Sequence, residues 1–141
     1  MAIATSDNLL KQPISSRGER ILQDNISEGE NILISLRGSF GQALIATEKR
    51  LYILKWGFQA GSLFGGRCLA FDYKNITGVT ITKNFSTGMI EIISAGTQEK
   101  KLTNTTAIKA DNAVAFYRKS FDSFQKASNF IRELINQAHN K

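Results

Sequence analysis

The sequence predicts a mainly β domain: a curled antiparallel sheet of about seven strands, capped by a C-terminal amphipathic helix and preceded by a short N-terminal helical extension. Two observations carry this prediction. Short segments rich in alternating apolar and polar residues follow one another from residue 31 to about residue 118, which is the period of β-strands. After them, apolar residues recur every three or four positions from Phe121 to Ala138, which is the period of a helix.

The chain is expected to comprise an extension, residues 1–30, and one domain, residues 31–141. A length of 141 residues is enough for one domain with a proper core. Within the extension, apolar residues at helical spacing predict a short helix over Ser16–Asn25 that docks on the main body. Gly18 weakens this helix, and Pro13 precedes it.

The strands are separated by polar corners, and tight links between the first three indicate an antiparallel meander. An Asp122 with Gln125 three residues later resembles a capping box that opens the C-terminal helix, expected over about 120–139. Residues 95–112 are polar and loop-rich, with at most a short strand at 101–103. The main strands are expected at 31–36, 42–47, 51–56, 68–73, 76–83, 89–94 and 113–118.

Residues 56–67 form a long apolar loop with four glycines, which a regular strand would not tolerate. Its aromatic side chains, flanked by Lys55 and Arg67, suit an anionic membrane interface or a partner groove. The alternative is that these side chains fill the end of the sheet structure or pack against the N-terminal helix. Phe130 lies off the centre of the C-terminal apolar stripe, and an exposed Phe130 would mark a partner surface.

The balance of charge favours anionic partners in general. Eighteen Lys and Arg residues against 12 Asp and Glu residues give a net charge of +6. These charges are scattered as pairs, and no run is dense enough to resemble a nucleic-acid-binding arm. The composition therefore argues against nucleic acid as the partner.

Side chains for catalysis are few. Cys68 and His139 are the only residues of their types and lie far apart in the sequence, so neither a catalytic dyad nor a zinc site is expected. The glycines at 61–66 lack the pattern of a phosphate-binding loop. We expect no enzyme activity, no metal and no cofactor, and we interpret Cys68 as a packed strand residue.

Particular stretches of the sequence resemble the bacterial pleckstrin-homology (PH)-like domain families and the related GRAM domains. The first is EGENILISLRGSFGQALIATEKRLYILKWGF (28–58), with an acidic-glycine lead into the first strand and a T-E-K-R-L-Y corner. The second is GGRCLAFDYKNITGVTI (65–81), which is similar to an F-x-Y-x-x-I-T-x-V segment of those families. The resemblance covers roughly residues 28–138. It implies a PH-like barrel or sandwich, and it raises both ligand binding and self-assembly as functions.

One departure concerns the ligand that the resemblance would suggest. Phosphoinositide-specific PH domains carry several basic residues in their first hairpin, whereas residues 37–42 offer only Arg37. The missing donors argue against tight phosphoinositide binding.

The sequence thus predicts a non-catalytic module that acts through protein–protein contacts, including homo-oligomerisation. The alternative is a peripheral module that binds anionic lipid through the 56–67 loop and its basic flanks. No apolar run approaches the length of a membrane span, so a cytoplasmic location is expected, at the inner membrane face if the alternative holds. The candidate binding residues are Arg37, Phe40, Lys55, Trp56, Phe58, Phe64 and Arg67.

Overall fold

The computed structural model of the chain describes residues 10–57, 66–94 and 112–140. The short strand expected at 101–103, and most of the loops expected at 56–67 and 95–112, lie outside the described residues. The elements are α1 (Ser16–Asn25), β1 (Ile32–Arg37), β2 (Gln42–Thr47), β3 (Arg50–Trp56), β4 (Gly66–Asp72), β5 (Ile76–Lys83), β6 (Thr87–Ser94), β7 (Ala113–Tyr117) and α3 (Phe121–His139), with 3-10 turns at Tyr73–Asn75 and Arg118–Ser120.

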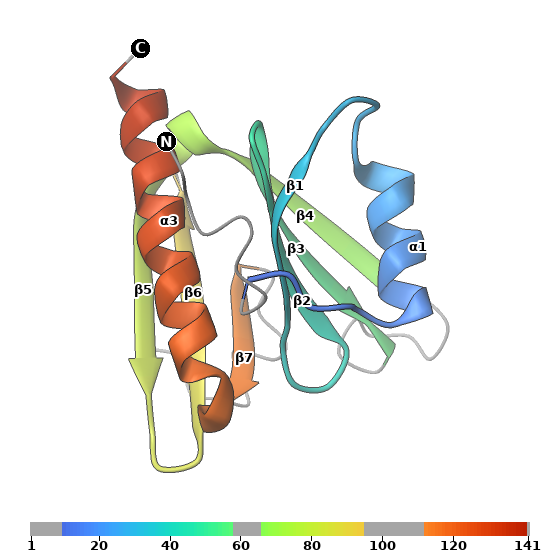
Figure 1. Cartoon of the computed structure of the whole chain (residues 1–141), viewed down its shortest axis with the longest axis vertical. Coiled ribbons are helices and arrows are strands. Elements are labelled where there is room, and N and C mark those ends of the chain that lie inside the picture. Colours follow the sequence, from blue (N-terminus) through green and yellow to red (C-terminus); the bar gives the residue numbers. More distant parts are fainter. Residues whose placement is uncertain (1–9, 58–65, 95–111, 141) are drawn as a thin grey trace.

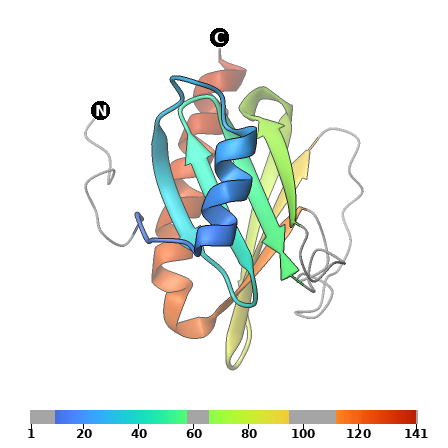
Figure 2. The same cartoon turned by 90° about the vertical axis from the view of Figure 1, so that its right-hand side faces the viewer.

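The strands form two antiparallel sheets with a helix on either side (Figure 1). One sheet has the order β1-β2-β3-β4, and the other has the order β5-β6-β7. Figure 2 shows α1 in front of the four-stranded sheet and α3 behind it. The mainly β fold with a C-terminal helix is therefore confirmed, and each of the seven expected strands is present within two residues of its expected ends.

The two sheets do not close into a barrel. Of the two arrangements that the PH-like resemblance implies, a barrel or a sandwich, the barrel is therefore wrong. At the corner where closure would occur, the outer edge of β7 meets the β1–β2 loop and the Gln42 side chain instead of a strand. The backbone N–H of Ser39 donates to the Ala115 carbonyl O at 2.9 Å. The Ala115 N–H donates to Gln42 Oε1 at 3.1 Å, so that corner is held without a strand pair.

Both faces of the four-stranded sheet are buried. One apolar cluster lies between the two sheets and α3, and a second lies between the four-stranded sheet and α1. Every residue of β2 is buried, as is every residue of β3 except Arg50. The predicted C-terminal helix covers only one of these faces, and α1 covers the other. Burial on two faces explains the nearly continuous apolar runs of these strands.

Gly18 allows α1 to approach the sheet closely. A Cβ at this position would lie 3.0 Å from the Trp56 ring, so a larger residue would push the helix away. The helix begins at the N-cap Ser15, whose Oγ accepts from the Gly18 N–H at 3.2 Å. The predicted helix is confirmed, and the glycine that weakens it locally permits its packing.

The C-terminal helix differs from the prediction in two details. The capping box does not form, because the 3-10 turn Arg118–Ser120 runs directly into the helix and puts Ser120 at the N-cap, with no side-chain cap bond. Asp122 instead lies in the first turn, where a negative charge favours the helix dipole. Phe130 is buried in the main core, so it does not mark a partner surface. None of the described helices is long and apolar enough to cross a membrane.

Candidate functional site

A pocket of about 470 Å³ lies where the β1–β2 loop meets the starts of both helices. The loop contributes residues 37–41, and the start of α3 contributes Tyr117, Lys119 and Ser120. Gln12 and Ser15, just before α1, and Trp56 of β3 complete the lining. Four segments that are distant in the sequence therefore meet at one end of the molecule, the lower end in Figure 1.

The β1–β2 loop is fixed from within and presents one aromatic side chain outward. Ser39 is buried and bonded to β7, and its carbonyl O accepts from Gln42 Nε2. Phe40 then adopts φ +52°, a left-handed conformation that non-glycine residues rarely hold. Its ring is 57% exposed and lies 6.2 Å, between ring centroids, from the half-exposed ring of Tyr117.

The β5–β6 hairpin adds a third exposed aromatic ring at the same end. Phe85 occupies the tip of this hairpin and is 92% exposed. The Arg118 guanidinium donates to the Phe85 carbonyl O at 3.2 Å, and the Arg118 N–H donates to the Ser86 carbonyl O at 3.0 Å. These bonds tie the hairpin to the turn that opens α3. We call the surface formed by Arg37, Phe40, Phe85, Tyr117 and Lys119 the aromatic end.

The aromatic end is basic. Arg37 and Lys119 line the pocket and are exposed, and none of the described residues that line it is acidic. The N-caps of α1 and α3, Ser15 and Ser120, also line the pocket, but Glu19 and Asp122 in the first turns offset the positive ends of the two helix dipoles. The basic character of the lining therefore comes from Arg37 and Lys119.

The structure divides the predicted binding residues into groups with different surroundings. Arg37, Phe40 and Trp56 line the pocket together. Trp56 is only 8% exposed, because its ring packs against Gly18 of α1, so it forms a wall and does not project. This is the packing against the N-terminal helix that the sequence left open as the alternative.

Lys55 is not a surface cation. It is 1% exposed, and its Nζ donates to Gln42 Oε1 at 2.7 Å and to the Ala113 carbonyl O at 2.6 Å. A buried ammonium group must be hydrogen-bonded, and here its acceptors belong to both sheets. Lys55 therefore joins the two sheets and is unavailable to an external ligand.

Arg67 is exposed on β4 and does not line the pocket, while Phe58 and Phe64 lie outside the described residues. Sequence reasoning missed Phe85, Tyr117 and Lys119. A signal for the last two was present in the sequence. Tyr117 is the last residue of a strand, and two cations, Arg118 and Lys119, follow it directly, which is typical of an exposed strand end.

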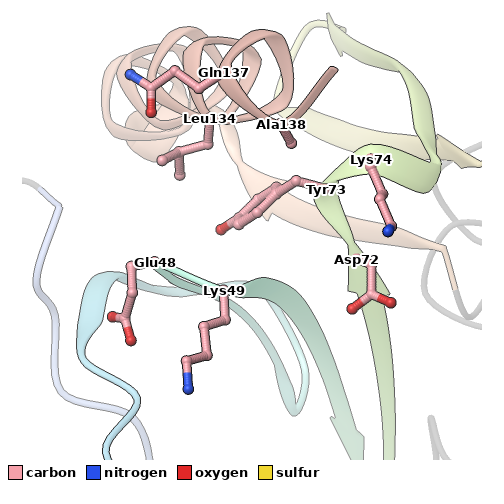
Figure 3. Close-up of a pocket in the computed structure, with 8 residues that line it drawn as sticks. All are labelled: Glu48, Lys49, Asp72, Tyr73, Lys74, Leu134, Gln137 and Ala138. Atoms are coloured by element: carbon pink, nitrogen blue, oxygen red, sulfur yellow. The ribbon is translucent and has the colours of Figure 1, made fainter. Parts of the chain in front are cut away.

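A second pocket, of about 420 Å³, lies at the opposite end of the molecule, the upper end in Figure 1. Figure 3 shows the residues that line it. It lies between the β2–β3 turn, the β4–β5 corner and the last turns of α3. Glu48 and Asp72 offset Lys49 and Lys74, so this pocket does not favour an ion of either sign. On its floor, the Tyr73 hydroxyl already donates to the Thr47 carbonyl O at 2.6 Å.

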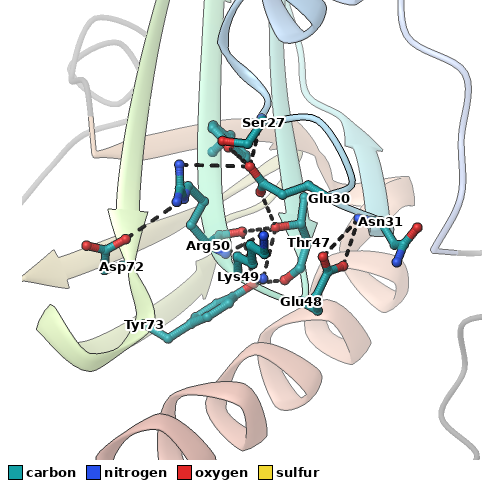
Figure 4. A network of polar contacts seen from close by, with 10 residues as sticks. Ser27, Glu30, Asn31, Thr47, Glu48, Lys49, Arg50, Asp72 and Tyr73 are labelled. Carbon is teal, nitrogen blue, oxygen red and sulfur yellow. Dashed lines mark hydrogen bonds and ion pairs between the residues drawn. The ribbon is translucent and has the colours of Figure 1, made fainter.

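Beside this pocket, a buried carboxylate organises a polar network (Figure 4). Glu30 accepts from Thr47 Oγ1 at 2.6 Å, from the Tyr52 hydroxyl at 2.8 Å and from the Ser27 N–H at 2.9 Å. The Arg50 guanidinium lies 3.8 Å away and also faces Asp72 at 3.9 Å. The network ties the segment before β1 to the β2–β3 turn and to β4.

The polar network explains the sequence stretches on which the PH-like resemblance rests. The lead at 28–31, the corner at 47–52 and the segment at 71–73 all contribute residues to it. Their shared role in this chain is to hold the fold together.

Protonation states follow from these surroundings. Burial acts to raise the pKa of Glu30, but hydrogen bonds from Thr47, Ser27 and Tyr52 and the charge of Arg50 outweigh it, so its pKa lies below the ordinary 4.5. Burial, with the Glu30 hydrogen bond, raises the pKa of Tyr52 to about 12. Burial also raises the pKa of Cys68 to about 11, so this side chain is an unactivated thiol at neutral pH.

Among the described residues, no cluster of three or more His, Cys, Asp or Glu side chains is placed to hold a metal ion. Comparisons of the chain with protein-family models, with curated proteins and with solved structures gave no match. The resemblance to PH-like and GRAM domains therefore stays a prediction from the sequence.

Proposed function

We propose that this chain is a non-catalytic binding module that attaches to an anionic membrane surface through its aromatic end. One observation carries the proposal: among the described residues, three of the four exposed large hydrophobic side chains, Phe40, Phe85 and Tyr117, lie at this end beside Arg37 and Lys119. Exposed aromatic rings beside cations are the side chains that enter the headgroup region of an anionic bilayer.

The distribution of these side chains supports a bilayer over a protein groove. Phe40 and Phe85 stand on the tips of two separate hairpins, and Phe85 is almost fully exposed. Protein-binding hot spots are contiguous and well packed in the bound state, whereas single rings on separate tips can insert independently among lipids.

The residues proposed to contact the membrane differ from those predicted from the sequence. The sequence pointed to aromatic and basic contacts of which two, Lys55 and Trp56, are buried. The full predicted set was Trp56, Phe58 and Phe64 with Arg37, Lys55 and Arg67. The contacts proposed here come from the β1–β2 loop, the β5–β6 hairpin and the turn before α3. With few convergent donors, binding would follow the charge density of the surface and not the identity of one headgroup.

Vesicle co-sedimentation with charge-matched variants tests this proposal. The double variant Arg37→Gln, Lys119→Gln removes two cations from the aromatic end, and Lys49→Gln, Lys74→Gln removes two from the opposite end. Each cation near an anionic surface contributes roughly 1 kcal/mol, so the first variant should bind phosphatidylserine-containing vesicles about 30-fold more weakly at low salt.

The opposite-end variant should bind nearly as well as the wild type, although its net charge is the same as that of the first variant. Equal losses of vesicle binding in the two variants would mean that binding depends only on net charge. That result would contradict binding through the aromatic end. No binding of the wild type to anionic vesicles at low salt would remove the proposal altogether.

A further inference from the structure

The turn before α3 carries two consecutive cations, Arg118 and Lys119, and the structure gives them different surroundings. Among the described residues that line the pocket at the aromatic end, Lys119 is present and Arg118 is not. The Arg118 side chain is exposed, but its guanidinium donates to the Phe85 carbonyl O at 3.2 Å, and its own N–H donates to the Ser86 carbonyl O at 3.0 Å. Arg118 is therefore directed at the tip of the β5–β6 hairpin.

The hairpin tip does not hold the Phe85 ring by packing. The ladder between β5 and β6 ends at the pair Lys83 and Gly88, and beyond it the Asn84 N–H donates to the Thr87 carbonyl O at 2.7 Å, which closes the turn. The Phe85 side chain is 92% exposed, so it has few neighbours that could fix it. The position of the ring therefore follows from the backbone of the tip and from whatever holds that backbone.

A second cation holds the hairpin nearer to its base. The Lys83 Nζ lies 4.5 Å from the centroid of the Phe121 ring, and Phe121 is the first residue of α3. An ammonium group above an aromatic face is attracted to it even at an exposed site. The hairpin is thus joined to the start of α3 at two heights, through Lys83 on β5 and through Arg118 at the tip.

We infer that Arg118 is a positioning residue, which holds the hairpin so that Phe85 meets the bilayer together with the other two rings of the aromatic end. This inference rests on the proposed attachment to an anionic membrane. A hairpin that is ordered beforehand does not have to be ordered during binding, so more of the interaction free energy of its ring appears as affinity. Arg118 acts through Phe85, whereas Arg37 and Lys119 act through their own charges.

The chemistry of this contact allows the two contributions to be separated. The guanidinium is a planar group with several N–H donors, which suits a lasting bond to a carbonyl oxygen at the protein surface. Its acceptor is the backbone carbonyl of residue 85, so the bond does not depend on the side chain at that position. Phe85→Ala therefore removes the ring and leaves the acceptor of Arg118 in place.

A double-mutant cycle on vesicle affinity tests the inference, with Arg118→Gln and Arg37→Gln as charge-matched changes. Each is measured by co-sedimentation with phosphatidylserine-containing vesicles at low salt, in the wild-type and in the Phe85→Ala background. The loss of affinity caused by Arg118→Gln should be about five-fold larger in the wild-type background, because only there must a loosened ring be ordered on binding. Arg37→Gln should cause the same loss in both backgrounds.

The order of the hairpin tip is measured without vesicles, by time-resolved fluorescence anisotropy of a tryptophan at the tip. Phe85→Trp in a Trp56→Phe background carries a single tryptophan. Arg118→Gln should increase the nanosecond mobility of this probe, and Arg37→Gln should leave it unchanged. Circular dichroism melting shows that each variant is folded at the temperature of the measurement.

Equal losses of affinity from Arg118→Gln in the two backgrounds would overturn the inference, since Arg118 would then act only through its charge. A probe at position 85 that Arg118→Gln does not loosen would overturn it as well. If the wild type did not bind vesicles but Arg118→Gln still loosened the probe, the proposed membrane function would fail, and the positioning of the hairpin by Arg118 would stand.

Discussion

Phe40 combines an unfavourable backbone conformation with an exposed ring, and function is a reason for a chain to keep such a residue. Asparagine tolerates the left-handed region better than alanine does, and both remove the ring. We therefore expect Phe40→Asn to be more stable than Phe40→Ala by about 1 kcal/mol, measured by urea unfolding.

Both variants should lose vesicle binding to the same extent, because binding depends on the ring and not on the backbone. If Phe40→Asn bound vesicles as the wild type does, the ring would have no role at the membrane.

Glu30 is the residue whose ionisation should matter most for folding. Its pKa is lowered in the folded chain, so its contribution to stability is fully present above its ordinary pKa of 4.5 and is lost as the pH falls through the lower folded value. Glu30→Gln replaces one carboxylate oxygen with an NH₂ group, so the Thr47 and Tyr52 hydroxyls can no longer both donate to this side chain. The free energy of unfolding should fall by about 1–3 kcal/mol at pH 7.

The cost of Glu30→Gln should shrink as the pH falls below 4.5, and thermal unfolding across this range measures it. Glu28→Gln, an exposed neighbour in the same segment, should change stability little at any pH. A constant cost of Glu30→Gln from pH 7 to pH 3 would show that the charge of Glu30 is not what holds the network.

At the scale of elements, the contact between the β1–β2 loop and β7 positions the candidate site. A Cβ on Gly38 would lie 2.6 Å from both the Ala115 carbonyl O and the Val114 side chain. Gly38→Ala should therefore cost about 1–3 kcal/mol, because the two sheets must separate at this corner.

The matched control is Gly78→Ala in β5, where the nearest atom would be at an ordinary 3.7 Å. Chemical unfolding of both variants measures the difference. Equal stabilities of the two variants would mean that the contact between the β1–β2 loop and β7 adjusts at little cost and does not hold the loop in place.

Local periodicity predicted the elements well and their ends less well. Alternation and helical spacing placed all seven strands and both helices, because each signal lies within one segment. The capping box was wrong because the 3-10 turn before α3 shifts the helix start, which local sequence does not reveal. The burial of β2 on both faces could be read only once α1 was placed.

At the scale of the whole molecule, the candidate site was only partly predictable. Arg37 and Phe40 were identified because the PH-like resemblance implies that they project from the same end as the 56–67 loop, and the pocket does contain them. Tyr117 and Lys119 join them through the packing of β7 against the β1–β2 loop, a contact between residues more than 70 positions apart. Lys55 was misplaced because a lysine at a strand end usually faces water, whereas here both sheets provide acceptors.

The central claim is that the aromatic end enters the membrane, and fluorescence from its most exposed position tests it most directly. Trp56 is the only tryptophan, so Phe85→Trp in a Trp56→Phe background carries a single probe at the hairpin tip. Its emission should shift to shorter wavelength with anionic vesicles and be quenched by brominated lipid, while Thr77→Trp, at the far end of β5, should stay unchanged. An unshifted emission at position 85 with saturating vesicles, or equal shifts at both positions, would contradict the account.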